Sequence, residues 1–128
     1  MRLLLDTHAI IWWLTDSARL GKEARALFDS SDVALCASIA SLWEIAIKRR
    51  TGKIEASASL VAAHLADAAV SVLPVEVTHL TMLEQLPLLH RDPFDRLLVA
   101  QALVTTATVL TDDKLIADYG VPCVAAGR

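Results

Sequence analysis

The amino-acid sequence predicts an α/β protein with a parallel central sheet and helices on both faces of that sheet. Short apolar segments alternate with longer segments of helical periodicity, which is the order expected of strand–helix–strand units. The short segments are apolar throughout, as expected of strands that helices cover on both sides. No linker or repeat interrupts this pattern, and 128 residues suit one folded unit. We therefore expect residues 1–128 to form a single domain.

Capping residues place the elements in the first half of the chain. Ser38 stands where an N-cap is needed before a helical segment, and Gly52 is suited to end that helix. The expected elements are a strand RLLL at 2–5, an apolar helix through 10–14, an amphipathic helix GKEARALFDSS at 21–31, a strand VALCA at 33–37 and a helix IASLWEIAIKRRTG at 39–52.

The second half continues the alternation. In HRDPFDRLLVAQA, at 90–102, Asp92 fits an N-cap, Pro93 the first helical position, and Asp95 the third, where an acid complements the helix dipole. Helix formation alone explains this stretch. The expected elements are a helix ASLVAAHLADAA at 58–69, a strand VSVLPV at 70–75, a helix at 78–86, a helix from 92, a strand ATVLTDD at 107–113, a short helix DKLIADY at 113–119 and a strand VPCVAA at 121–126.

The composition excludes several classes of protein. Hydrophobic residues make up 55% of the chain, yet charged residues and histidines interrupt every apolar run before it reaches the roughly 18 residues of a membrane span. Asp6 breaks the apolar start too early for a signal peptide, so we expect a cytoplasmic protein. Cys36 and Cys123 lack the spacing of a zinc site, and we expect both to be small buried residues without a disulfide.

A net charge of −3 argues against general electrostatic binding of nucleic acid, which would need a local basic patch. One cluster of cations qualifies. It is equally well explained as the solvated C-terminal end of a helix, where positive charge is favourable. Its members are Lys48, Arg49, Arg50 and Lys53.

Acidic residues gather at one predicted edge of the sheet. Asp6 ends the first strand, Asp112 and Asp113 follow the strand TVLT, and Asp95 opens the helix that leads into that strand. Capping explains each acid singly, with Asp6 and Asp112 as N-caps. Together they would repel one another and raise each other's pKa unless a cation held them. Oxygen ligands of this kind suit Mg²⁺ or Mn²⁺, which can support phosphodiester hydrolysis.

Four motifs carry a resemblance to a known family. The segments LLLDTHAIIWWL, SLWEIAIK, LPLLHRDPFDRLLVAQA and LTDD occur in the order and spacing of PIN-domain proteins, notably the VapC-type toxins of toxin–antitoxin pairs. The resemblance covers almost the whole chain. It implies a three-layer α/β/α fold around a central, mainly parallel sheet of about five short strands. It also implies an endoribonuclease that uses Mg²⁺ or Mn²⁺, pairs as a homodimer and is blocked by an antitoxin.

The resemblance assigns roles to individual residues. The catalytic, metal-holding acids correspond to Asp6, Glu44, Asp95 and Asp113, with Asp113 aligned better than Asp112. Glu44 also stands four residues before Lys48, the order that favours a helical salt bridge. Their positions beside these acids lead us to expect supporting roles for Thr7, Asp92, Thr111 and Asp112. The local cluster of positive charge leads us to expect RNA binding by Lys48, Arg49, Arg50 and Lys53.

The remaining polar and aromatic side chains receive smaller roles. His90 can in principle shuttle protons, whereas His8, His64 and His79 are expected to be surface or half-buried residues. The three tryptophans are expected in the core or at an interface. An apolar patch that includes Ile11, Trp12 and Trp13 supports self-association and antitoxin binding.

Two other functions fit part of the pattern. A PIN-like module that binds RNA or a partner without cutting needs the fold but not the full set of acids. An aspartyl-phosphate phosphatase also places an Asp after its first strand, but it usually has a second Asp two residues later, where this chain has His8. P-loop and dinucleotide sites are excluded because none of the 4 glycines has the required spacing.

Overall fold

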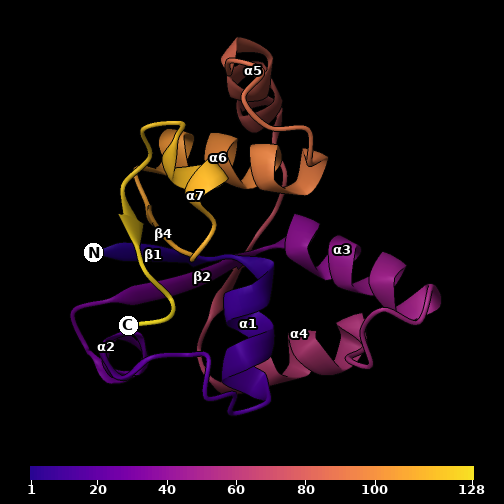
Figure 1. The fold of residues 1–128 in the computed structure, drawn as a ribbon, viewed down its shortest axis with the longest axis vertical. Coiled ribbons are helices and arrows are strands. Elements are labelled where there is room, and N and C mark those ends of the chain that lie inside the picture. Colours follow the sequence, from indigo (N-terminus) through magenta and orange to yellow (C-terminus); the bar gives the residue numbers. More distant parts are fainter.

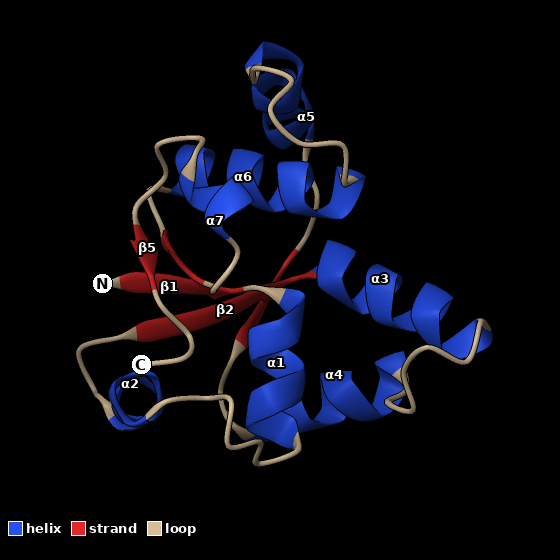
Figure 2. Cartoon of the chain, viewed as in Figure 1, coloured by secondary structure: helices blue, strands red, loops and turns tan.

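The computed structural model describes residues 1–128 and contains one sheet of five parallel strands in the order β3-β2-β1-β4-β5. Helices cover both faces of the sheet, which Figures 1 and 2 show close to edge-on. The predicted three-layer α/β/α fold is therefore confirmed. The strands are β1 (Arg2–Leu5), β2 (Ala34–Ser38), β3 (Ser71–Leu73), β4 (Thr108–Leu110) and β5 (Cys123–Val124).

Seven helices connect the strands, and none of them is long and apolar enough to cross a membrane. The predicted helices are all present, with ends that differ by a few residues. The first strand has the predicted bounds and the second is shifted by one residue, whereas the last three are shorter than predicted because only part of each apolar segment pairs with a neighbour. The helices are α1 (Thr7–Leu14), α2 (Lys22–Asp29), α3 (Ile39–Arg50), α4 (Ala58–Asp67), α5 (Val77–Gln85), α6 (Pro93–Thr105) and α7 (Lys114–Ala117).

The hydrophobic core consists of one cluster on each face of the sheet. Leu3 and Leu5 of β1 face the cluster formed with α1, α2, α3 and α4, whereas Leu4 faces the cluster formed with α6 and α7. All three side chains are fully buried. Successive strand residues point to opposite faces, and here both faces are apolar. This arrangement explains why β1 reads as a continuous apolar run.

Capping side chains fix where the helices begin. Asp6 Oδ1 accepts a hydrogen bond from the Ala9 amide at 2.7 Å, and Ser38 Oγ accepts one from Ala40 at 3.0 Å. Asp92 Oδ1 accepts bonds from two amides in the first turn of α6, at 2.8 and 3.2 Å. These three predicted N-caps are confirmed.

The N-cap of α7 corrects the sequence prediction. Asp113, and not Asp112, accepts the hydrogen bond from the Leu115 amide, at 2.9 Å. The side chain of Asp112 accepts a bond from the Gly127 amide at 2.9 Å and so holds the C-terminal segment. A side chain on Gly127 would meet Asp112 Oδ2 at 2.7 Å, so this contact favours glycine there.

Burial corrects two further predictions about single residues. His79 is 2% exposed, and its Nδ1 accepts a bond from the Glu76 amide in a capping box that begins α5. Cys36 is buried as expected, but Cys123 is exposed, and both are free thiols. Trp43 lies outside the core, with 60% of its surface exposed, so an interface stays the prediction for this side chain.

The expected apolar patch on α1 is absent. The core cluster formed with α1, α2, α3 and α4 half-buries Ile11, Trp12 and Trp13. Trp13 stacks on Phe28 of α2, with 4.9 Å between the ring centroids. Exposed apolar side chains occur instead on several other elements, and four of them lie on α3 and α4. They are Ile39, Trp43, Ile47 and Leu60.

Candidate functional site

The two central strands deliver acidic residues to one edge of the sheet. β1 and β4 are parallel neighbours with Leu5 paired to Leu110, and the Asp6 amide donates to the Leu110 carbonyl at 3.1 Å. Asp6 and the segment Thr111–Asp113 therefore leave the sheet side by side, as the sequence predicted. This is the edge beyond the carboxyl ends of the strands, where ligands bind in open parallel sheets.

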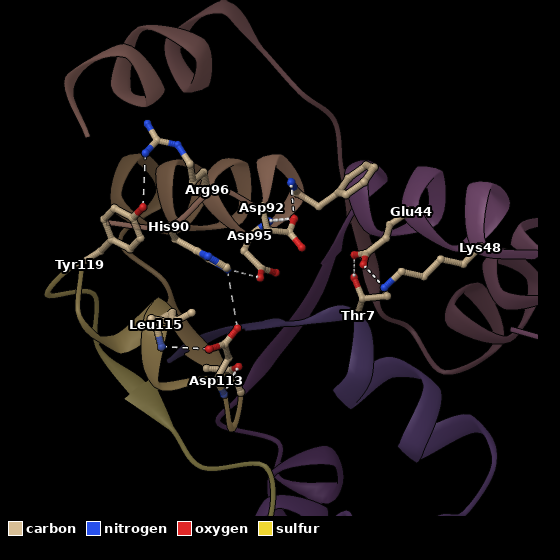
Figure 3. A network of polar contacts seen from close by, with 12 residues as sticks. Thr7, Glu44, Lys48, His90, Asp92, Asp95, Arg96, Asp113, Leu115 and Tyr119 are labelled. Atoms are coloured by element: carbon tan, nitrogen blue, oxygen red, sulfur yellow. Dashed lines mark hydrogen bonds and ion pairs between the residues drawn. The ribbon is translucent and has the colours of Figure 1, made fainter. Parts of the chain in front are cut away.

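A compact group of three side chains lies at this edge (Figure 3). His90 Nε2 is 2.9 Å from Asp95 Oδ2 and 4.0 Å from Asp113 Oδ2. Each residue offers one ligand atom, and these atoms all lie within 4.8 Å of one another. The loop after α5, the first turn of α6 and the N-cap of α7 each contribute one member. Segments distant in sequence thus build a group of the size that one cation requires.

Burial raises the pKa of Asp95. The pKa of this carboxyl rises from 3.8 to about 6, chiefly because burial penalises its charged form. The negative charges of Asp92, Asp113 and Glu44 raise it further, while the hydrogen bond from His90 opposes the rise. The same interactions show that these four acids share one electrostatic environment. A divalent cation at this point would reverse the penalty, since it would favour the ionised carboxylates.

Asp6 lies deeper than the other acids, with 6% of its surface exposed. Burial raises its pKa, whereas hydrogen bonds from the Thr111 side chain and the Ala9 amide lower it, and the charge of Asp113 raises it again. A hollow of about 300 Å³ opens in front of it, lined by Asp6, His8, Trp12, Arg19, Asp112 and Asp113. Asp6 and Asp113 therefore face a common space that the solvent can enter.

Glu44 lies outside the compact group. Its Oε1 accepts a hydrogen bond from Thr7 Oγ1 at 2.7 Å, and its Oε2 pairs with Lys48 Nζ at 2.6 Å, both visible in Figure 3. Glu44 is 4% exposed, so these two partners hold a buried charge in place. The predicted Glu44–Lys48 salt bridge is confirmed. Ligation of an ion by Glu44 would require one of these contacts to be exchanged.

The supporting residues have defined local tasks. Thr111 Oγ1 accepts a hydrogen bond from the Asp113 amide at 3.0 Å and so fixes the turn that orients Asp113. Asp92 caps α6 and thereby places the first turn that carries Asp95. Asp112 borders the hollow but uses its Oδ1 to hold Gly127. The side chain of Asp113, not that of Asp112, reaches toward His90 and Asp95.

The basic cluster of α3 divides into two parts. Lys48 forms an ion pair with Glu44 and so lies close to the acids. Arg49 donates a hydrogen bond to the Glu55 carbonyl, and Arg50 and Lys53 are exposed where the helix ends. Figure 1 shows this end of α3 projecting from the body of the protein.

The sequence did not predict that His90 lies beside Asp95 and Asp113. Its position in the chain held a usable signal, because a residue two places before the N-cap Asp92 lies where the chain turns into the first turn of α6. Periodicity does not describe such loop residues, so the direction of the His90 side chain emerged only from the packed structure. His90 and Arg91 together also line a pocket with Leu83, Leu88 and Arg96.

Comparisons with known proteins agree with this architecture. The structure resembles VapBC2 from Rickettsia felis, solved bound to a DNA fragment from its promoter, with a TM-score of 0.74, 13% identity and coverage of 97% of this chain and 98% of that chain. It also resembles VapBC-1 from nontypeable Haemophilus influenzae, with a TM-score of 0.66, 16% identity and full coverage of both chains. No curated protein matches the chain. The PIN domain family model matches residues 3–122, and the chain therefore belongs to the PIN domain family.

Proposed function

We propose that this protein is a metal-dependent endoribonuclease and the toxin of a toxin–antitoxin pair, with residues 1–128 forming one PIN domain. The observation that carries the proposal is the group of half-buried acids at the carboxyl edge of β1 and β4. Burial raises the pKa of Asp6 and that of Asp95, so the protein penalises the charged form of both carboxyls. Membership of the PIN family and the likeness to two VapBC structures support the same function.

The donor set suits a small divalent cation. Asp95 and Asp113 offer carboxylate oxygens within one compact group, Asp6 shares a hollow with Asp113, and Glu44 is close enough to raise the pKa of Asp95. Mg²⁺ and Mn²⁺ prefer such oxygen ligands, and their charge would offset the repulsion among the acids. When bound, the ion would polarise a phosphate oxygen and make a nearby water more acidic.

The chain's own residues would complete hydrolysis of an RNA phosphodiester. Asp113 or Glu44 would orient a water molecule and accept its proton. The water oxygen then forms a bond to phosphorus as the bond from phosphorus to the leaving ribose oxygen breaks. Asp113 is the better placed of the two, because both oxygens of Glu44 already have partners, whereas Asp113 uses only Oδ1, which accepts from the Leu115 amide. Thr7 and Thr111 would keep the neighbouring carboxylates in position.

The cations of α3 would bind the RNA backbone on either side of the cleaved bond. Arg50 and Lys53 are exposed, and Arg49 is exposed although its guanidinium holds a carbonyl. Lys48 is nearer to the acids and would contact a phosphate only by sharing its ammonium with Glu44. Backbone contacts of this kind add affinity without reading the RNA sequence.

The partners would be a cognate antitoxin and a second copy of the chain, in the cytoplasm. The exposed apolar side chains of α3 and α4 support an interface, because an unpartnered apolar face on a small domain is costly in water. The solved structural neighbours include two VapBC proteins, which supports a partner of the antitoxin kind.

RNA cleavage by the purified protein tests the proposal. We expect cleavage that needs Mg²⁺ or Mn²⁺, stops with EDTA, and is lost in Asp6→Asn while the circular dichroism spectrum is retained. Asp67→Asn, an exposed acid of α4, is the matched control and should cut normally. RNA that is bound but never cut by the wild-type protein would instead identify a non-catalytic binding module.

A further inference from the structure

Building on the proposed cation site, we propose that the imidazole of His90 is a direct ligand of the ion. The site would then combine one nitrogen donor with carboxylate oxygens from Asp95 and Asp113. This assigns His90 a place on the metal, whereas the function proposed above needs only the acids.

The distances within the compact group match the spacing of ligands around one ion. Two donors bound at about 2.1 Å and at right angles lie about 3.0 Å apart, and two opposite donors lie about 4.2 Å apart. His90 Nε2 is 2.9 Å from Asp95 Oδ2 and 4.0 Å from Asp113 Oδ2. Both separations fall at or just below these two values. A histidine that served only to hold Asp95 would have no reason to face Asp113 as well.

Hydrogen bonds from Arg96 hold the loop that carries His90 in place without a bound ion. The guanidinium of Arg96, one turn into α6, donates to the Pro87 carbonyl at 3.0 Å and to the Leu83 carbonyl at 3.4 Å, and it also meets the Tyr119 hydroxyl at 3.3 Å. These bonds tie the loop and α5 to the helix that bears Asp95. The His90 side chain is 16% exposed. Binding an ion would therefore require little rearrangement, which favours affinity.

A nitrogen donor changes which ions the site prefers. Imidazole is a better ligand for Co²⁺ and Ni²⁺ than for Mn²⁺, and it is a poor ligand for Mg²⁺, whose preference is for oxygen. A neutral imidazole also adds no negative charge to a group that already holds the carboxylates of Asp95 and Asp113. We therefore expect Co²⁺ to bind more tightly than Mg²⁺, and expect this preference to depend on His90.

The chain has three histidines besides His90, and each must be considered as the source of a nitrogen ligand. His8 is the competitor, because it lines the hollow with Asp6 and Asp113. His64 is exposed on α4 and serves as a matched control. His79 is 2% exposed with its Nδ1 bonded to the Glu76 amide, so it is unable to reach an ion at this edge.

Electron spin echo envelope modulation of the Mn²⁺-loaded protein tests the ligand directly, because it detects a ¹⁴N nucleus bonded to the ion. We expect ¹⁴N modulation in the wild type, His8→Gln and His64→Gln proteins. In His90→Gln the modulation should be absent or Mn²⁺ binding itself lost. If His90→Gln fails to fold, a signal that survives in both other variants still assigns the nitrogen to His90, since His79 is enclosed.

Calorimetric titration with Co²⁺ and Mg²⁺ provides the second readout. His90→Gln should weaken Co²⁺ binding by about tenfold or more and change Mg²⁺ binding far less. A wild-type protein that binds Mn²⁺ without nitrogen modulation would overturn the role of His90 and leave the carboxylate site standing. Modulation lost in His8→Gln but kept in His90→Gln would also overturn it. A wild type that binds no Mn²⁺ at all would contradict the proposed function as well.

Discussion

Some carboxylates of this protein stabilise the native state, whereas another lowers its stability. Asp6 and Asp92 cap helices, which stabilises the native state. Asp95 does the reverse, because burial raises its pKa to about 6, so that its ionisation at neutral pH lowers the stability of the native state. A side chain kept in an environment that penalises its charge suggests a function that needs the charge. The acids could be located from the sequence because strand ends and caps are local signals, whereas the direction of His90 depends on packing.

Asp95→Asn should stabilise the ion-free protein at pH 8. A carboxyl whose pKa is 3.8 unfolded and about 6 folded loses native stability as pH rises between those values. We expect a gain of about 1–2 kcal/mol at pH 8, less than the full shift implies because the bond to His90 weakens. Below about pH 4 the gain should vanish, since the carboxyl is then protonated in both states.

Thermal unfolding in EDTA at pH 4 and pH 8 measures this effect. The melting temperature of Asp95→Asn should rise by several degrees at pH 8 only, with Asp67→Asn unchanged at both pH values. Added Mn²⁺ should then stabilise the wild type more than the variant. An equal gain at both pH values would show that the charge of Asp95 is not the cause.

At the scale of elements, the sequence predicted which helices and strands exist but not all of their caps. Asp112 and Asp113 are neighbours with the same side chain, and either can cap α7 by propensity. Asp113 caps the helix because Asp112 instead accepts a hydrogen bond from the Gly127 amide of the C-terminal segment. These two residues are 15 positions apart, so no local pattern predicts their contact. The prediction of an exposed apolar patch on α1 is likewise wrong, because Phe28 of α2 covers Trp13.

Removing the cap of α6 should damage the site through its helix. Asp92→Ala deletes two hydrogen bonds and should lower the free energy of unfolding by about 0.5–2 kcal/mol. Because the cap positions the turn that carries Asp95, Mn²⁺ affinity should fall as well. Asp92→Ser keeps a capping oxygen and should restore most of both quantities. Urea unfolding and calorimetric titration check this, and full Mn²⁺ affinity in Asp92→Ala would contradict the link.

The exposed end of α3 should contribute to RNA binding through charge alone. Replacing Arg50 and Lys53 by Ala should weaken binding and reduce the slope of log affinity against log salt by about 0.7 for each phosphate contact removed. Binding of a non-cleavable RNA analogue measured by fluorescence anisotropy at several salt concentrations gives the slope. Lys22→Ala, an exposed cation of α2, is the matched control. An unchanged slope in the double variant would move the RNA path away from α3.

At the scale of the whole molecule, the topology decides where chemistry can occur. The strand order puts β1 and β4 side by side at the centre, so acids more than 100 residues apart in sequence leave the sheet at one point. This could be predicted because parallel strands share the direction of their ends. Glu44 could not be placed in the same way, since its helix position leaves open whether it faces the ion or, as observed, Thr7 and Lys48.

A crystal structure of the Mn²⁺-soaked protein, with anomalous data collected at the manganese edge, tests most directly whether this edge binds an ion. We expect an anomalous peak between α6 and the β4–α7 turn, with carboxylate oxygens of Asp95 and Asp113 at about 2.0–2.4 Å from it and Asp6 beside it. The peak should disappear in Asp95→Asn crystals soaked in the same way. An ordered, solvent-accessible site without anomalous density, or a peak only elsewhere on the protein, would contradict the central claim.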